Sequence, residues 1–377
     1  MITYSRSIFT MLPVLFVFCC SCQSQPTSGP LRIDKEQWKQ FYPDWPVDSL
    51  LSLADQFPNG AEISMAAVQN GEITYLGVRR EHDSLVLIDN QHRVYEIGSI
   101  SKVLTSAMAA QLANEGKLDL KTPADAYLPY EIAAQATITP LQLANHTSGL
   151  PRLPSNMMLY AVTHPSNPYK TYGEQKLKAY LSKKVELDNT PGTTYAYSNL
   201  GAGLLGYLLT QIEGDSYENL MQSRVCTPLG MAHTTTDQGK IKDLLVPGLQ
   251  ANGTPTSNWD LNVLAGAGGI LSCADDMSKF MISQLDTTNS AWQLQQEKTF
   301  TVSDNMDLAM AWHILHTGSG HKWYWHNGGT GGYRTSLTID PGNQIAGLVF
   351  TNVSPEHSAS GLVDQLNYAL LRKLLAE

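Results

Sequence analysis

The stretch Tyr95-Glu96-Ile97-Gly98-Ser99-Ile100-Ser101-Lys102 places a serine where an extended segment enters a helix, with a lysine three residues later. The residues that follow, 103–113, favour helix and carry apolar side chains at helical spacing, and a glycine at 116 provides the stop. Ser99 and Lys102 are therefore expected one turn apart on one helix face. A serine at a helix N-terminus also lies beside free backbone N–H groups. The stretch thus contains the parts of an acyl-transfer nucleophile: a hydroxyl, an amine to accept its proton, and donors for an oxyanion.

Length, composition and charge exclude several classes of protein. The 377 residues suffice for one large domain or two lobes, and 42% hydrophobic with 16% charged residues is typical of a globular protein. The formal net charge is −9, and the chain has no run rich in lysine or arginine. We therefore expect no nucleic-acid partner.

The N-terminal residues predict export. Arg6 is the only charged residue among the first 22, and the apolar run from Ile8 to Phe18 is too short to span a bilayer. Cys19-Cys20-Ser21-Cys22 follows and resembles a bacterial lipoprotein signal, with Cys22 as the lipidated residue because small Ser21 precedes it. We interpret residues 1–22 as a lipoprotein-type signal peptide and 23–33 as a linker. Ordinary secretory cleavage is the alternative, and both place the mature protein outside the cytoplasm, in the periplasm or outer envelope.

The remaining cysteines and the histidines give no ligand pattern. Beyond the leader only Cys226 and Cys273 remain, and they could pair in an oxidising compartment, which the sequence leaves open. His313, His316 and His321 lie close together in the sequence without a recognised spacing for a metal. We therefore predict no metal and no other cofactor.

Strand signals stand at both ends of the chain and helical signals between them. Residues 61–68 and 72–79 are expected as two strands joined by Asn70-Gly71, since both turn residues tolerate positive φ. Residues 117–260 are mostly helix and loop, whereas strands return at 323–326, 334–339 and 345–351 before a closing helix. This order predicts an α/β (α+β) domain over 34–377. Its antiparallel sheet would be flanked by helices, with a mainly helical lobe inserted at about 117–260 and a site in the cleft between them.

Two further motifs follow in the order that a serine acyl-enzyme requires. Tyr197-Ser198-Asn199 lies in a turn that enters a helix after a Pro-Gly pair, and Tyr197 and Asn199 would project into the cleft. His326-Asn327-Gly328-Gly329 ends an aromatic strand, and its glycines let a backbone approach a substrate closely. Ser319-Gly320-His321-Lys322 and Tyr217-Glu218-Asn219 lack this context, and we reject them. His316-Thr317-Gly318 is the alternative third motif; we prefer His326 and place His316 in a turn.

Together Ser-x-x-Lys, Tyr-x-Asn and His-x-Gly resemble the signature motifs of the serine β-lactamase and penicillin-binding protein superfamily, from about residue 60 onward. The tyrosine of the second motif is similar to class C β-lactamases and to the DD-peptidases and esterases allied to them. Class C enzymes have Lys-Thr-Gly as the third motif. A histidine there resembles certain DD-peptidases more, and it puts efficient β-lactam hydrolysis in doubt.

The resemblance implies catalytic roles for four residues. Ser99 would attack the carbonyl, and Lys102, kept partly neutral, would help to remove its proton. Tyr197 would pass a proton to the leaving group and help to activate the deacylating water. His326 would support this proton network or bind the substrate carboxylate. If its imidazole titrates near pH ~6.5, the KM for anionic substrates should rise with pH around neutrality.

The resemblance also implies substrate-binding roles. Asn199 would hold the substrate amide, and Asn327 and Gly328 would belong to the binding strand. The backbone N–H groups of Ser99 and Gly329 would form the oxyanion hole. The implied function is a cell-envelope serine hydrolase acting on D-Ala-D-Ala-type peptides or β-lactams. An esterase of the same fold, or a penicillin-binding sensor that stays acylated, are the alternatives.

Overall fold

The computed structural model describes residues 30–183 and 185–376, so the expected signal peptide and most of the linker lie outside the described residues. The end of the linker contacts the domain, since the Leu31 N–H donates to Asp55 Oδ1 over 2.6 Å and Arg32 pairs with Asp83 at 3.3 Å. The helices α1 (Lys35–Phe41) and α2 (Val47–Gln56) follow. Pro43 and Pro46 stand between the two helices and separate them.

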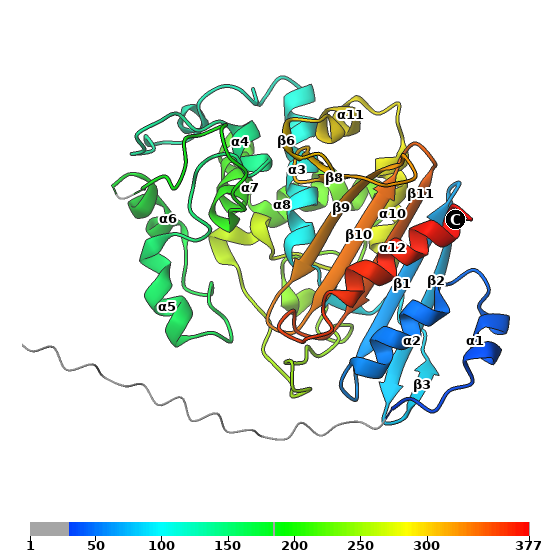
Figure 1. Cartoon of the computed structure of the whole chain (residues 1–377). Helices are drawn as coiled ribbons and strands as arrows, with labels where there is room; N and C mark the ends of the chain where they lie inside the picture. Colours follow the sequence, from blue (N-terminus) through cyan, green and yellow to red (C-terminus); the bar gives the residue numbers. More distant parts are fainter. Residues whose placement is uncertain (1–29, 184, 377) are drawn as a thin grey trace, which may run out of the picture.

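A nine-stranded antiparallel sheet forms the centre of the molecule (Figure 1). Its strand order is β3-β2-β1-β11-β10-β9-β8-β7-β6. The strands are β1 (Glu62–Gln69), β2 (Glu72–Glu81), β3 (Ser84–Leu87), β6 (Phe300–Ser303), β7 (Met306–Leu308), β8 (His313–His316), β9 (Lys322–Gly329), β10 (Arg334–Asp340) and β11 (Ile345–Thr351).

The first strand of the sheet pairs with its last, near the middle of the sheet. Ile63 of β1 lies opposite Thr351 of β11, and the pairing continues to Gln69 opposite Ile345. The predicted hairpin at Asn70-Gly71 is present, and both residues have positive φ, 53° and 84°. All seven residues of β11 are buried, because helices cover both faces of the sheet here.

Two layers of helices enclose the sheet (Figure 1). The closing helix α12 (Leu362–Leu374) and α2 pack on one face, and α10 (Ala274–Leu285) packs on the other. Behind α10 runs α3 (Ser101–Asn114), in which eleven of the fourteen residues are buried. A helix that is buried on nearly all sides is a central helix, and α3 carries the start of the site.

The helical lobe lies beside the sheet, to the left in Figure 1. Its helices, together with α11 near the sheet edge, are α4 (Pro140–Ala144), α5 (Met158–Thr163), α6 (Glu174–Leu181), α7 (Asn199–Glu213), α8 (Tyr217–Met221), α9 (Thr227–Leu229) and α11 (Ser290–Gln296). The mixed fold with a large antiparallel sheet and flanking helices is the one that the sequence predicts. Among the described residues no helix is long and apolar enough to cross a bilayer.

A separate two-stranded sheet, which the sequence does not predict, positions the site. Strand β4 (Val94–Glu96) pairs with β5 (Leu271–Cys273), with Val94 opposite Cys273. Immediately after β4 the chain enters the turn of Ser99, and immediately before β5 it passes through the glycine segment 266–269. The pairing therefore places two distant segments of the chain side by side at the N-terminus of α3.

Candidate active site

Ser99 lies in a single 3-10 turn, Gly98–Ile100, that runs directly into α3. Gly98 has φ of 53°, and a Cβ there would stand 2.6 Å from the backbone nitrogen of Gly329. Gly328 is equally constrained, since its Cβ would stand 2.0 Å from the Ile97 carbonyl oxygen. Only glycines allow this approach, and it places the end of β9 against the Ser99 turn.

Lys102 is completely buried and contacts three polar groups. Its Nζ lies 3.0 Å from Ser99 Oγ, 2.9 Å from Asn199 Oδ1 and 2.6 Å from the carbonyl oxygen of Ala267. Burial lowers the pKa of this amine well below its ordinary value, and the positive charge of Arg152 lowers it further. The predicted contact between Ser99 and Lys102 is present, and burial favours the neutral form of the amine, which can accept a proton.

A neutral amine satisfies all three neighbours of Lys102 Nζ. It has two N–H donors and one lone pair, whereas Asn199 Oδ1 and the Ala267 carbonyl can only accept. In the structure Nζ donates to all three oxygens; in the neutral amine the two N–H groups would serve Asn199 and Ala267, and the lone pair would face the Ser99 hydroxyl. This arrangement would place the lone pair next to the hydroxyl proton that Ser99 must lose to act as a nucleophile.

Tyr197 completes the contacts of the nucleophile. Its hydroxyl donates to Ser99 Oγ over 2.7 Å. Burial raises the pKa of the phenol, although Ser99 and Arg152 oppose this effect. The His146 ring packs on the Tyr197 ring with centroids 4.3 Å apart, and Arg152 Cζ lies 5.1 Å from the Tyr197 centroid. Tyr197 is therefore held as a proton donor rather than as a phenolate.

Asn199 is the first residue of α7, and both the oxygen and the nitrogen of its side-chain amide have a hydrogen-bond partner. The preceding Ser198 caps the helix by accepting the Gly201 N–H over 2.8 Å. Asn199 accepts from Lys102 through Oδ1 and donates through Nδ2 to the Tyr169 hydroxyl over 3.1 Å. Asn199 keeps a second N–H on Nδ2 and a second lone pair on Oδ1 with which it could bind a substrate amide.

His326 is buried near the end of β9. Its Nδ1 lies 2.6 Å from the Asn327 carbonyl oxygen, and within the described part of the chain its Nε2 has no hydrogen-bond partner. The ring centroid lies 6.3 Å from that of Tyr197 and 5.3 Å from that of His313. Burial lowers the pKa of His326 well below its ordinary value, and His313 and Lys102 lower it further. This shift opposes the expected titration near neutral pH, because it favours the neutral imidazole there.

Asn327 lies on the opposite face of β9 from His326, since successive side chains of a strand alternate. Its Nδ2 donates to Asp364 Oδ2 of α12 over 3.0 Å, and Arg334 of β10 pairs with the same carboxylate. The side chain of Asn327 is therefore engaged with α12, and its place in the binding strand stays a prediction for its backbone. Arg334 forms a structural ion pair with the same helix.

The two rejected patterns and the alternative third motif lie elsewhere. His316 ends β8 opposite Lys322, and its Nε2 lies 2.8 Å from Asp307 Oδ2, so it stands in a strand and not in the expected turn. Tyr217 contacts the Thr105 hydroxyl at 2.7 Å on the lobe side of α3. Lys322 is exposed at the start of β9. Cys226 and Cys273 are both free and buried.

Several residues near the nucleophile lie outside the three motifs. His146 has positive φ, 59°, and its Nδ1 accepts the Ser198 N–H over 3.2 Å, which fixes the turn of Tyr197. The Tyr195 hydroxyl lies 2.9 Å from His313 Nε2. Burial lowers the pKa of His313 to about 4. A ring of neutral aromatic and imidazole groups thus surrounds Tyr197.

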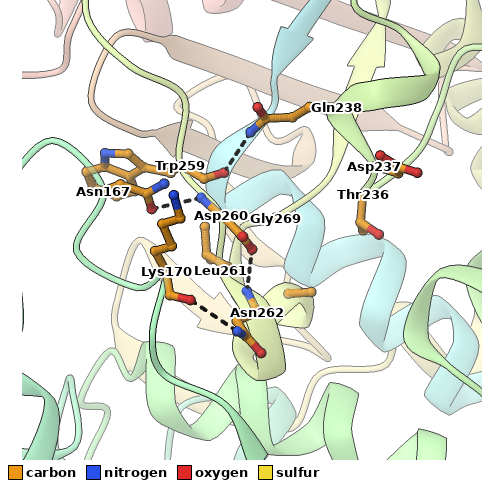
Figure 2. A pocket seen from close by; sticks show the side chains of 11 residues that line it. Asn167, Lys170, Thr236, Asp237, Gln238, Trp259, Asp260, Leu261, Asn262 and Gly269 are labelled. Atoms are coloured by element: carbon orange, nitrogen blue, oxygen red, sulfur yellow. Dashed lines mark hydrogen bonds between the residues drawn. The ribbon is translucent and has the colours of Figure 1, made fainter.

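A cavity of about 560 Å³ is lined by Trp259 and by Gly269 of the glycine segment (Figure 2). The Trp259 ring packs against Tyr169, the neighbour of Asn199, with centroids 5.6 Å apart. The walls of the cavity combine the Trp259 ring with polar side chains, among them Asn167, Lys170 and Gln238. The volume falls within the range of small-molecule sites.

Comparison with known proteins agrees with this geometry. Residues 53–369 match the family described as Beta-lactamase. The chain belongs to the beta-lactamase family. It is 29% identical over 297 residues to the D-alanyl-D-alanine-carboxypeptidase/endopeptidase AmpH of Escherichia coli, covering 73% of this chain and 74% of that protein. It is 28% identical over 277 residues to a beta-lactamase of Pseudomonas fluorescens, covering 71% and 73%.

The fold is also that of a solved member of the family. A class C beta-lactamase from Rhodobacter sphaeroides superposes with a TM-score of 0.72 at 20% identity, covering 87% of this chain and 98% of that one. The protein is thus a serine hydrolase of the beta-lactamase family, as its motifs predict.

Proposed function

We propose that this protein is an exported serine peptidase that forms an acyl-enzyme on Ser99 and acts on peptides ending in D-Ala-D-Ala. The neutral, buried amine of Lys102, held against Ser99 Oγ by Asn199 and Ala267, carries the proposal. Such an amine can take the serine proton at neutral pH, and a solvated lysine cannot.

The contacts support a balanced acylation step. Lys102 Nζ takes the proton of Ser99 while Oγ bonds to the substrate carbonyl carbon, and the N–H groups of Ser99 and Gly329 stabilise the oxyanion. The tetrahedral intermediate then expels the leaving amine, which receives the phenol proton of Tyr197. The proton on Lys102 then returns to the Tyr197 phenolate, so that both groups regain their starting state. Water repeats the sequence to release the acyl group and regenerate Ser99.

The third motif departs from that of class C enzymes, and the name of one relative favours a peptide over a β-lactam. A neutral His326 supplies no fixed charge for a substrate carboxylate, whereas the lysine of class C enzymes does. The Arg152 guanidinium, against the Tyr197 ring, would supply that charge instead. The relative from Escherichia coli is named a carboxypeptidase/endopeptidase, and the polar cavity beside Trp259 suits a peptide chain.

A substrate panel tests the proposal. Turnover of a D-Ala-D-Ala peptide, a chromogenic cephalosporin and a p-nitrophenyl ester is compared for the wild type and Ser99→Ala. We expect the highest kcat/KM for the peptide and loss of all three activities in Ser99→Ala. Preference for the ester would favour an esterase, and near-normal turnover in Ser99→Ala would refute the proposal.

Intact-mass measurement after mixing with a β-lactam separates an enzyme from a sensor. An adduct on Ser99 that decays indicates turnover, whereas one that persists indicates a penicillin-binding sensor. Rapid deacylation requires a positioned water, and the Tyr197 hydroxyl beside Ser99 Oγ supports turnover.

We also propose that residues 1–22 are a lipoprotein-type signal, with lipid attached at Cys22, followed by the linker 23–33 and a hydrolase domain over 34–377. Labelling of cells with a fatty-acid analogue should mark the wild type but not Cys22→Ser. Release of an unlabelled wild-type protein would instead support ordinary secretory cleavage.

A further inference from the structure

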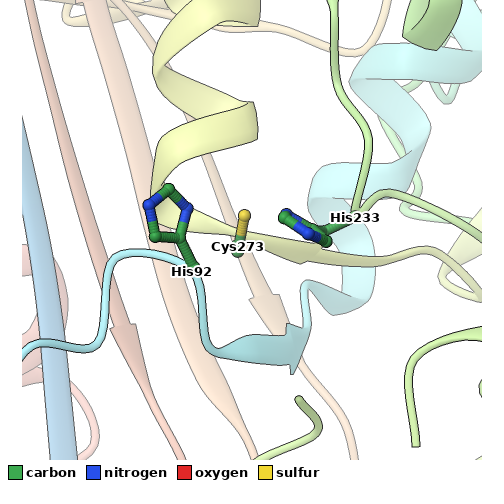
Figure 3. Close-up of side chains that lie close together, drawn as sticks. All are labelled: His92, His233 and Cys273. Atoms are coloured by element: carbon green, nitrogen blue, oxygen red, sulfur yellow. The ribbon is translucent and has the colours of Figure 1, made fainter. Parts of the chain in front are cut away.

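Three potential metal ligands lie close together beside the β4–β5 pair. His92 stands in the loop before β4, His233 follows α9, and Cys273 ends β5. One ligand atom of each lies within 4.8 Å of the other two. Figure 3 shows the two rings on either side of the Cys273 sulfur. The three residues come from distant parts of the chain, so no spacing pattern marks them in the sequence.

The donor set matches zinc. Imidazole nitrogen and thiolate sulfur are its usual protein ligands, at about 2.0–2.1 Å and 2.3 Å, so two ligand atoms of a tetrahedral site lie about 3.5 Å apart. The two ligand atoms that lie farthest apart here must therefore approach each other by about 1 Å to bind one ion. The His92 side chain is 55% exposed, so it is free to rotate, and an ion can enter from that side.

The surroundings of Cys273 and His92 support ligation. Cys273 is the N-cap of α10, where its Sγ accepts the Asp276 N–H over 3.5 Å. Burial and the Asp276 carboxylate raise the pKa of this thiol, and the N–H groups at the start of α10 oppose that effect, so the charge of a bound cation would be needed to hold the thiolate. His92 Nδ1 faces Asp275 Oδ2 at 3.8 Å, which leaves Nε2 for an ion. A carboxylate behind the histidine is the usual way in which a ligating imidazole is oriented.

The other contacts of these groups fix the pocket. Asp275 is held by the Tyr75 hydroxyl at 3.0 Å and by Lys279 at 2.8 Å. The backbone N–H of His233 donates to Asp276 Oδ2 over 2.7 Å. The buried Nδ1 of the same His233 ring has no hydrogen-bond partner among the described residues. A buried polar atom without a partner is costly, and ligation would satisfy it.

We propose that His92, His233 and Cys273 bind one zinc ion, with water as the fourth ligand. The bound ion would link the segments of the chain that position the active site and would stabilise them. Binding displaces the thiol proton of Cys273 to solvent and forms the zinc–sulfur bond. The ion contacts neither Ser99 nor the substrate, so the chemistry proposed above does not pass through it.

The bound zinc would stabilise both segments that hold Ser99 and Lys102. Val94 of β4 lies opposite Cys273, and β4 leads into the turn of Ser99. Before β5, the Ile270 N–H donates to Ser101 Oγ over 3.1 Å, and Ala267 accepts from Lys102. Tying the ends of β4 and β5 should therefore raise the melting temperature, with kcat/KM of the folded enzyme changed less than about twofold, since bound zinc stabilises the native state.

The test uses the mature chain after treatment with a chelator. Calorimetric titration should show one equivalent of zinc, and cobalt should give the near-ultraviolet charge-transfer band of a thiolate ligand. Cys273→Ser should abolish the band. His92→Gln and His233→Gln should each weaken zinc binding at least tenfold, and Asp275→Asn should weaken it about tenfold. The matched control His164→Gln, an exposed histidine outside the cluster, should bind as the wild type does.

Two outcomes would overturn the proposal: absence of the thiolate band in the wild type, or equal zinc affinity in the wild type and His92→Gln. Because His92 is exposed, the second comparison remains valid even if Cys273→Ser does not fold. Acylation of Ser99 is measured separately, so failure of the zinc site would leave the proposed function standing.

Discussion

Replacing Lys102 with methionine removes the amine but keeps a side chain of nearly the same length. The amine contacts Ser99 Oγ, Asn199 Oδ1 and the Ala267 carbonyl, and Lys102 is buried. We expect Lys102→Met to abolish proton removal from Ser99 while the fold remains. General-base catalysis contributes about 10²–10⁴ in rate, which corresponds to about 3–5 kcal/mol of activation free energy.

The cost to stability should be smaller. Two hydrogen bonds, to Asn199 and Ala267, are lost at about 1 kcal/mol each. The variant no longer buries an amine whose pKa is lowered well below its ordinary value by burial, and a swap of similar volume is well tolerated. The free energy of unfolding should therefore change by less than about 2 kcal/mol, whereas kcat/KM should fall by about 10²–10⁴.

Steady-state kinetics on the best substrate and urea denaturation measure the two effects separately. Lys322→Met is the matched control, because Lys322 is exposed and belongs to a rejected Ser-x-x-Lys pattern. The Lys102→Met and Tyr197→Phe losses should be less than additive in the double variant, since both groups act on one oxygen. A kcat/KM within tenfold of the wild type, or a stability loss above about 4 kcal/mol, would refute this account of Lys102.

Three further predictions follow from burial and close contact. Burial raises the pKa of Glu96 to about 7 from 4.5. The stability that the protonated carboxyl contributes to the fold is therefore present at acid pH and is lost as the pH rises through 7. Between pH ~4.5 and ~8 the wild type should lose about 3 kcal/mol more unfolding free energy than Glu96→Gln, and parallel urea-denaturation profiles would contradict this. The lowered pKa of His326 should keep the KM for a carboxylate substrate constant from pH ~6.5 to ~8; a rise that His326→Gln removes would show that the imidazole titrates there. Gly328→Ala should lower stability by about 3 kcal/mol or more, because its Cβ would meet the Ile97 carbonyl at 2.0 Å, whereas Gly361→Ala, with open space around it, should denature as the wild type does.

Local signals predicted much of this fold. Asn70-Gly71 forms the expected hairpin, and the strand at 345–351 is present with the same bounds. The short strands β6, β7 and β8 at the sheet edge were not assigned individually, because three or four residues carry too little alternation to distinguish them from loop. The pairing of β4 with β5 also has no local signature.

For the candidate site, too, the sequence predicts some features and not others. The motifs identify Ser99, Lys102 and Tyr197, and the structure brings them together. The environment of a side chain depends on tertiary contacts that the motifs do not encode. The neutral state of His326 follows from its burial beside His313 and Lys102, and the orientation of Asn327 toward α12 follows from strand alternation.

The pairing of β1 with β11 has a consequence for how the chain reaches its final state. Ile63 and Thr351 are about 290 residues apart in the sequence, so the middle of the sheet closes only after almost the whole chain is available. Contacts of such long range make folding slow. A chain that emerges N-terminus first therefore cannot complete its core early. It remains able to pass through a narrow translocation channel unfolded, and it can assemble on the far side of the membrane.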